Sequence, residues 1–119
     1  MMIMSEFMTL NDDLIKQITL IIKDPIKELM GDNAEDIILF GSCARGDYNN
    51  NSDIDIAIIT RTGREENAGF RMGLAEIATD IALEYFTVVN FLCIPEKEYE
   101  ERKSWYELYK NIALEGNVL

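Results

Sequence analysis

Hydrophobic residues recur every three or four positions between Asn11 and Met30, the spacing of an amphipathic helix. The residues that carry this period are Leu14, Ile15, Ile18, Ile21 and Ile22. Asn11 or Asp12 is suited to cap the start of this helix, and Gly31 to end it. Because proline fits the first turn of a helix better than its interior, Asp24-Pro25 predicts that the segment divides there into two helices.

Later segments of the chain alternate between strand and helix patterns. Three apolar runs predict strands: Glu35 to Phe40, Ser52 to Thr60 and Phe86 to Ile94. Helices are predicted to begin at Ser42, to run from Arg64 or Phe70 to Tyr85, and to cover Glu96–Arg102 and Trp105–Glu115. The order α-β-α-β-α-β-α indicates an α/β (α+β) fold, with a small sheet covered by helices.

The composition is that of a globular protein, with 119 residues, 48% of them hydrophobic and 28% charged. We expect one domain over residues 1–119, and we leave residues 1–8 out of the fold argument because their several methionines make the start uncertain. Neither a membrane span nor a signal peptide is expected, so a cytoplasmic location is predicted.

The net charge and the types of residue present argue against several functions. A net charge of −11 argues against direct nucleic-acid binding and fits solubility, a basic partner, or carboxylates that need cations. The chain has no histidine, which removes Ser-His and Cys-His nucleophiles and histidine zinc sites. Cys43 and Cys93 have no metal-binding spacing, and we interpret Cys43 as a packing residue.

The second predicted strand carries two aspartates at alternate positions. Ile54, Ile56 and Ile58 alternate with Asp53, Asp55 and Ala57. Alternate strand residues point to the same face, so the two carboxylates should lie side by side and require a compensating arginine or cation. Mg²⁺ prefers one or two carboxylates together with water and phosphate oxygens, which this arrangement offers.

A glycine and a serine follow the first predicted strand. Gly41 permits close approach of another backbone, and Ser42 offers a hydroxyl and an N–H group to a phosphate. Arg45 is either a phosphate contact or an internal partner of the aspartates. Taken singly, a Gly-Ser turn is most often only a turn, and Asp-x-Asp on a strand is often a solvated face.

The complete pattern is Gly41-Ser42-x-Ala44-Arg45-Gly46, five residues, and then Ser52-Asp53-x-Asp55-x-x-Ile58. It resembles the signature of the minimal nucleotidyltransferases, which share the palm fold of DNA polymerase β. This resemblance implies a small mixed sheet with helices on one side.

The resemblance also implies the chemistry of the site. Gly41, Ser42, Arg45 and Ser52 would bind a nucleoside triphosphate, with ATP expected. Asp53 and Asp55 would be the catalytic residues and would bind Mg²⁺, in a two-ion site, with Mn²⁺ as the alternative. An acceptor hydroxyl would attack the α-phosphate and release pyrophosphate.

Members of this family usually carry a third acidic residue on the later strand, where this chain has Asn90. An amide can offer an oxygen to a metal but cannot act as a base. Glu84 could substitute for it, as could Glu96 or Glu98 if the strand register differs. The alternative for Glu84 is a solvated position at a helix end.

Three functions remain open at this point. The first is an Mg²⁺-dependent nucleotidyltransferase that moves AMP onto an acceptor hydroxyl, in the manner of antitoxins that neutralise helical HEPN ribonucleases. The second is a catalytically impaired protein of the same fold that acts by binding a partner, which the missing carboxylate favours. The third is a small-molecule modifier resembling the aminoglycoside nucleotidyltransferases, for which the chain leaves little room.

Overall fold

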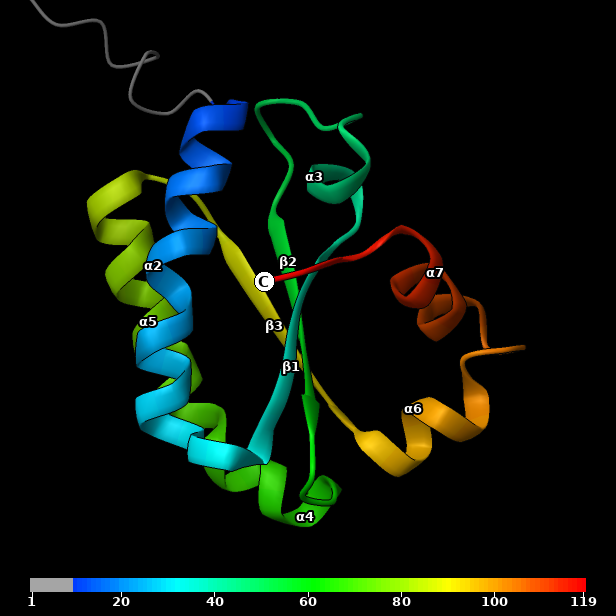
Figure 1. Ribbon diagram of the computed structural model, residues 1–119. Coiled ribbons are helices and arrows are strands. Elements are labelled where there is room, and N and C mark those ends of the chain that lie inside the picture. The colour runs from blue at the N-terminus through cyan, green and yellow to red at the C-terminus, as the bar shows by residue number, and fades with distance from the viewer. Residues whose placement is uncertain (1–9) are drawn as a thin grey trace, which may run out of the picture.

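A four-stranded mixed sheet forms the centre of the computed structural model, which describes residues 10–119 (Figure 1). Its strands are β1 (Ala34–Phe40), β2 (Ile54–Thr60), β3 (Val89–Pro95) and β4 (Asn117–Val118), in the order β3-β2-β1-β4. β1 is antiparallel to β2 and β4, whereas β2 and β3 are parallel. The three predicted strands are confirmed. The interpretation of residues 1–8 as an uncertain start lies outside the described residues, which begin at residue 10.

The first helix, α2 (Asp12–Met30), is continuous, so the predicted division at Pro25 is wrong. The side chain of Asn11 caps its start by accepting a hydrogen bond of 2.9 Å from the Leu14 N–H. One face of the helix is buried along its whole length; its residues are Ile15, Ile18, Ile22, Ile26 and Met30. Burial of this stripe on both sides of Pro25 outweighs the one backbone hydrogen bond that a proline removes.

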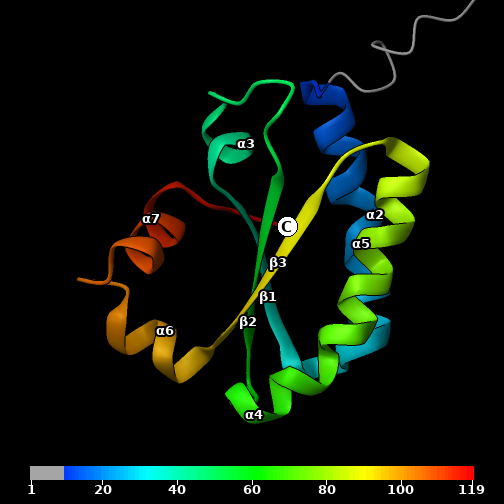
Figure 2. The same ribbon diagram turned by 180° about the vertical axis from the view of Figure 1, so that it is seen from behind.

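Helices cover both faces of the sheet, as Figures 1 and 2 show from opposite sides. α2 and α5 (Arg71–Tyr85) cover one face, and α6 (Glu96–Arg102) and α7 (Glu107–Glu115) cover the other. The one-sided sheet implied by the family resemblance is therefore wrong. The reason lies in β2, where Ile54, Ile56 and Ile58 are buried toward α2 and α5, while Ala57 and Ile59 are buried toward α6 and α7.

Short elements connect the strands to these helices. α3 (Ser42–Arg45) follows β1, and α4 (Arg64–Asn67) with the 3₁₀ turn Ala68–Phe70 leads from β2 into α5. The predicted helical starts at Ser42 and Arg64 are both confirmed, as are the helices after β3. No helix within residues 10–119 is long and apolar enough to cross a membrane.

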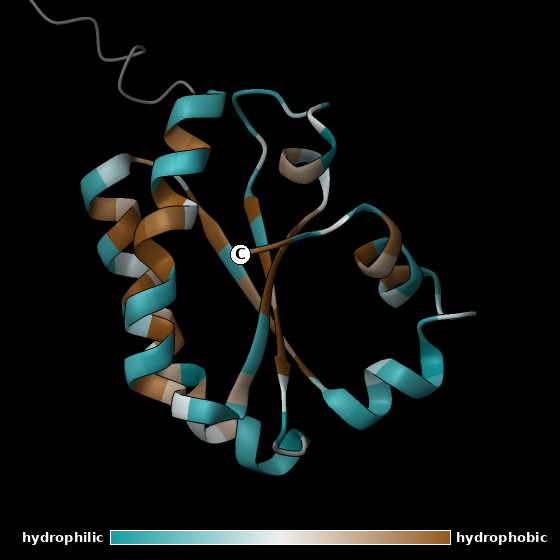
Figure 3. Ribbon diagram, viewed as in Figure 1, coloured by the Kyte–Doolittle hydropathy of each residue, from teal (hydrophilic) through white to brown (hydrophobic). Residues whose placement is uncertain are grey.

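The chain ends in β4, a strand that the hydrophobic pattern does not predict. β4 pairs with the middle of β1, and the N–H of Leu119 donates to the Ile37 carbonyl at 2.8 Å. Figure 3 shows the consequence for the core: the hydrophobic colour is concentrated on the strands and on the helix faces turned toward them. The last residues are thus part of the sheet that carries the candidate site.

Candidate active site

Three polar side chains converge at the end of the sheet at which the parallel strands β2 and β3 begin. Asp53 directly precedes β2, Asp55 lies on β2, and Asn90 is its register partner on β3. The Nδ2 of Asn90 donates to Oδ2 of Asp53 at 2.9 Å and to Oδ1 of Asp55 at 3.3 Å. The structure therefore brings the two predicted carboxylates to one point, on the face of the sheet that bears α6 and α7.

Gly41 lies against this trio from the neighbouring strand. It joins β1 to α3 with a φ of +74°, and a Cβ atom there would lie 2.7 Å from Oδ2 of Asp55. Both the backbone conformation and the contact therefore require glycine at this position. Ser42, the first residue of α3, follows directly, so the Gly-Ser turn and the aspartates belong to one site.

Cys43 is a buried packing residue, as predicted from the sequence, and it lies next to the backbone of Asp53. Its side chain is buried, and its Sγ lies 3.5 Å from the Asp53 carbonyl oxygen, to which it donates. Burial, followed by the negative charge of Asp55, raises the pKa of the thiol. A thiol with a raised pKa is a poor nucleophile, so this cysteine supports the site without taking part in its chemistry.

The surroundings of Asp55 disfavour the charged form of its carboxyl group. Partial burial raises its pKa, and the charge of Asp53 acts in the same direction, whereas the hydrogen bond from Asn90 lowers it. One neutral amide is thus the main compensation that the protein itself supplies. A divalent cation between the carboxylates would offset the repulsion between them.

Arg45 does not contact Asp53 or Asp55, so the alternative in which it is their internal partner is wrong. Its guanidinium instead bridges Asp47 at 3.2 Å and Glu115 at 3.3 Å, and it remains exposed. Glu115 lies at the end of α7, seventy residues further along the chain, and no sequence signal indicates this contact. The contact between Arg45 and a nucleotide stays a prediction.

Ser52 stabilises the loop between α3 and β2. Its hydroxyl accepts a hydrogen bond of 2.9 Å from the Asn49 N–H, and its own N–H donates to the Asn49 carbonyl at 3.0 Å. The hydroxyl of Tyr48 donates to Asp12 and so ties the loop to the start of α2. The loop is fixed beside the carboxylates, and the contact of Ser52 with a nucleotide stays a prediction.

The glutamates considered as a third acidic residue lie elsewhere. Glu84 is on α5, which covers the opposite face of the sheet, and it lines a small pocket with residues of α2. Glu96 and Glu98 lie beyond the far end of β3. That end, at Pro95, is five residues or about 17 Å from Asn90 along the strand. Among residues 10–119, no group of three acidic, histidine or cysteine side chains is arranged to hold a metal.

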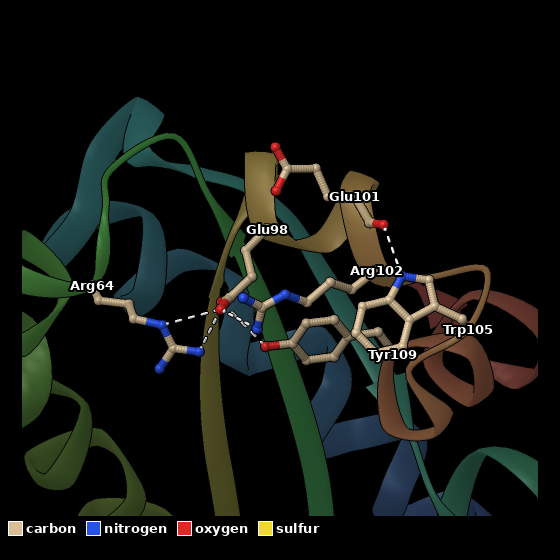
Figure 4. A network of polar contacts seen from close by, with 6 residues as sticks. All are labelled: Arg64, Glu98, Glu101, Arg102, Trp105 and Tyr109. Atoms are coloured by element: carbon tan, nitrogen blue, oxygen red, sulfur yellow. Dashed lines mark hydrogen bonds and ion pairs between the residues drawn. The ribbon is translucent and has the colours of Figure 1, made fainter.

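Glu98 has a structural role at that far end (Figure 4). Its carboxylate accepts hydrogen bonds from Arg64 at 2.6 Å, Arg102 at 2.8 Å and Tyr109 at 3.2 Å, and its side chain is only 12% exposed. These bonds, with that from Arg64 first, lower the pKa of Glu98. The network joins α4, α6 and α7, so Glu98 stabilises the packing of these helices.

The glycine-serine turn after β1 and the two carboxylates at the start of β2 are the features that the family resemblance implies for a nucleotidyltransferase. The comparison of the sequence with known families agrees with this class. A sequence model of the nucleotidyltransferase domain family matches residues 15–114. The chain therefore belongs to the nucleotidyltransferase domain family, whose members generally use divalent metals.

Two curated relatives come from Methanocaldococcus jannaschii. The chain is 35% identical over 83 residues to a protein named "Putative protein adenylyltransferase MJ0604", a match that covers 70% of this chain and 75% of that protein. It is 44% identical over 39 residues to "Putative protein adenylyltransferase MJ0141", covering 33% of this chain and 39% of that protein.

A solved structure confirms the fold. The crystal structure of a Sulfolobus solfataricus protein described as "a putative nucleotidyltransferase" superposes with a TM-score of 0.53 at 22% sequence identity. The match covers 89% of this chain and 82% of that one. The mixed sheet with its helices is therefore a nucleotidyltransferase fold.

Proposed function

We propose that this protein transfers AMP from ATP to a hydroxyl group of an acceptor protein. The observation that carries the proposal is the convergence of Asp53 and Asp55 on one point, 2.9 and 3.3 Å from the Asn90 amide nitrogen, with Gly41 packed against Asp55. The similarity to two proteins named as protein adenylyltransferases supports both the adenylyl group and a protein acceptor.

We propose Mg²⁺ as the metal, with Mn²⁺ as the alternative. The donor set fits a hard cation, because Asp53 and Asp55 offer carboxylate oxygens and Asn90 would offer its amide oxygen after rotation of the side chain. When bound, the cation would neutralise negative charge on the phosphates during transfer. Gly41 and Ser42 would then hold the triphosphate against the two aspartates, and Arg45 and Ser52 would border it.

The transfer itself is a displacement at the α-phosphorus of ATP. The acceptor oxygen forms a bond to that phosphorus, the bond to the oxygen that bridges the α- and β-phosphates breaks, and pyrophosphate leaves. The hydroxyl proton leaves to water, directly or through the exposed carboxylate of Asp53. Asn90 cannot accept this proton, so its part is to position the carboxylates and the acceptor.

A HEPN-type helical protein is the acceptor that we propose to test first. This proposal rests on the family resemblance and on the net charge of −11, which would favour association with a basic partner. The test uses α-labelled ATP with the purified candidate in Mg²⁺. Label transferred to the candidate, and lost with Asp53→Asn, is the expected result.

The first experiment needs no acceptor. Calorimetric titration with ATP should show binding in Mg²⁺ and none in EDTA, and the Asp53→Asn/Asp55→Asn variant should lose it while remaining folded. A titration with GTP in Mg²⁺ tests the proposed preference for adenine. If the folded wild-type protein binds no nucleotide in Mg²⁺, the proposed function is wrong.

A second function is favoured by one observation. The amide of Asn90 donates a hydrogen bond to each carboxylate, so the protein itself partly compensates the trio, as it would in a protein that acts only by binding a partner. Such a protein would bind its partner equally well with and without ATP and Mg²⁺. It would also tolerate Asp53→Asn without loss of that binding.

A further inference from the structure

A groove of about 480 Å³ runs along the outer edge of β3, the strand that carries Asn90. Five consecutive residues, Val89 to Cys93, line one wall. Since successive strand residues point to opposite faces, a groove that contacts all five must follow the backbone edge of the strand. The other wall comes from α4, the 3₁₀ turn and the first half of α5.

The backbone along this edge is available for hydrogen bonding. The Ile54 N–H donates to the Val88 carbonyl at 2.9 Å, which fixes the phase of the parallel ladder between β2 and β3. In this hydrogen-bond pattern the N–H and C=O groups of Asn90 and Leu92 point toward β2. Those of Val89, Phe91 and Cys93 point toward the groove. Within residues 10–119, no hydrogen bond involves the outward groups. An edge of this kind accepts an added strand.

The charge of the groove is opposite to that of the whole chain. Arg64 and Arg71 line it and no carboxylate does, although the chain has 22 acidic and 11 basic residues. The charge of Arg64 is largely compensated by its ion pair of 2.6 Å with Glu98. The positive charge left uncompensated along the groove is that of Arg71, which makes no ion pair within the described part of the chain. An acidic ligand therefore fits this groove better than a basic one.

The groove is continuous with the candidate active site. Asn90 belongs to both, because it lines the groove and donates to Asp53 and Asp55. The arginines belong to α4 and to the first turn of α5, which lie at the opposite end of the sheet (Figure 1). A ligand that follows the edge would thus have one end beside the carboxylates and the other beside the arginines.

We propose that the groove binds the acceptor segment in an extended conformation, as an additional strand on β3. The residue that carries the hydroxyl would lie next to Asn90, and acidic residues would lie near Arg64 and Arg71. At about 3.3 Å per residue, the position opposite Cys93 is three residues from the one opposite Asn90. The acceptor would therefore carry acidic residues three or more positions from its hydroxyl residue. This inference rests on the proposed function, since it identifies the acceptor of that same site.

The test uses two labelled peptides with blocked ends, Tyr-Thr-Val-Glu-Glu and Glu-Glu-Val-Thr-Tyr, because the strand direction is open. Each is compared with a version that is N-methylated at alternate peptide groups, which cannot form the ladder. Binding to the full chain is followed by fluorescence anisotropy, and amide exchange is followed by NMR. One peptide should bind, N-methylation should weaken it at least tenfold, and exchange should slow at Val89, Phe91 and Cys93.

Two charge-reversal variants test the acidic end of the segment. Arg71→Glu should weaken peptide binding by about fivefold or more. Lys16→Glu, an equal charge change at an exposed position on α2, should leave it within about twofold. Equal effects of the two variants would show only a response to net charge and would overturn the role of the groove.

The outcomes separate this inference from the proposed function. Binding of neither peptide at millimolar concentration, or equal binding of the N-methylated peptide, overturns the added strand. The same protein preparation is titrated with ATP and Mg²⁺. Nucleotide binding without peptide binding would refute the inference alone, whereas peptide binding without nucleotide binding would refute the proposed function.

Discussion

The substitution Asn90→Asp tests how the three side chains share charge. It replaces the amide that donates to Asp53 at 2.9 Å and to Asp55 at 3.3 Å with a third carboxylate. At separations near 3 Å and an effective dielectric constant of 40–80, suited to an exposed site, each new pair repels by about 1–3 kcal/mol. After rotation of the side chains and screening by salt, we expect a net loss of about 2 kcal/mol in the free energy of unfolding.

Thermal unfolding in EDTA and in Mg²⁺ measures this effect. A loss of about 2 kcal/mol corresponds to a fall of about 8 °C in Tm for a chain of this size. Mg²⁺ at a hundred times its Kd should return about 2.7 kcal/mol, because it binds only the folded protein. The variant should therefore be less stable than wild type in EDTA and should gain more than wild type from Mg²⁺.

An exposed asparagine provides the matched control. Asn111→Asp adds the same charge at an exposed position of α7 that makes no hydrogen bond with the trio, and it should change Tm by about 2 °C or less. Equal Tm values for the two variants in EDTA would refute the repulsion among the carboxylates. If Mg²⁺ stabilises Asn90→Asp no more than wild type, the trio is not a metal site.

Three further predictions concern single side chains. Gly41→Ala should lower the free energy of unfolding by about 3 kcal/mol and weaken ATP binding, because it adds a clash with Asp55 to a positive φ. Gly46→Ala is the control: with a φ of +89° and open space around the new Cβ, it should cost only about 1 kcal/mol in chemical denaturation. Because the pKa of Asp55 is raised, the folded state binds its proton more tightly, and stability should fall as the pH rises through and just above the ordinary carboxyl range. Asp55→Asn should remove this dependence of the unfolding free energy on pH. An unchanged pH dependence in that variant would refute the role of Asp55. Glu98→Gln should cost about 1–2 kcal/mol by urea unfolding without altering ATP affinity; an altered affinity would show that Glu98 acts on the site.

The sequence predicted much of the site because its information is local. Alternation along β2 is sufficient to place Asp53 and Asp55 on one face, and the structure confirms that they converge. Gly41 could be identified because it directly ends a strand, where a glycine permits the sharp turn. These features depend on neighbours within a few residues, and strand periodicity describes such neighbours well.

The contacts of Arg45 and Glu84 could not be predicted in the same way. The partner of Arg45 is on α7, and the distance between Glu84 and the aspartates depends on which face of the sheet α5 covers. Both are consequences of how helices pack on the sheet, and no residue near either position specifies that packing. The same limit applies to the continuous α2, where burial of Ile22 and Ile26 against the sheet outweighs the local effect of Pro25.

The sequence by itself determined three of the four strands, the convergence of the carboxylates and the family to which the chain belongs. Only the tertiary structure decided that helices cover both faces of the sheet, that Asn90 and not Glu84 lies beside the two aspartates, and that β4 completes the sheet. It also decided that the outer edge of β3 borders a groove with two arginines. The physical reason is that local periodicity determines the direction in which a side chain points. The burial of apolar surface between distant segments determines which residues that side chain contacts.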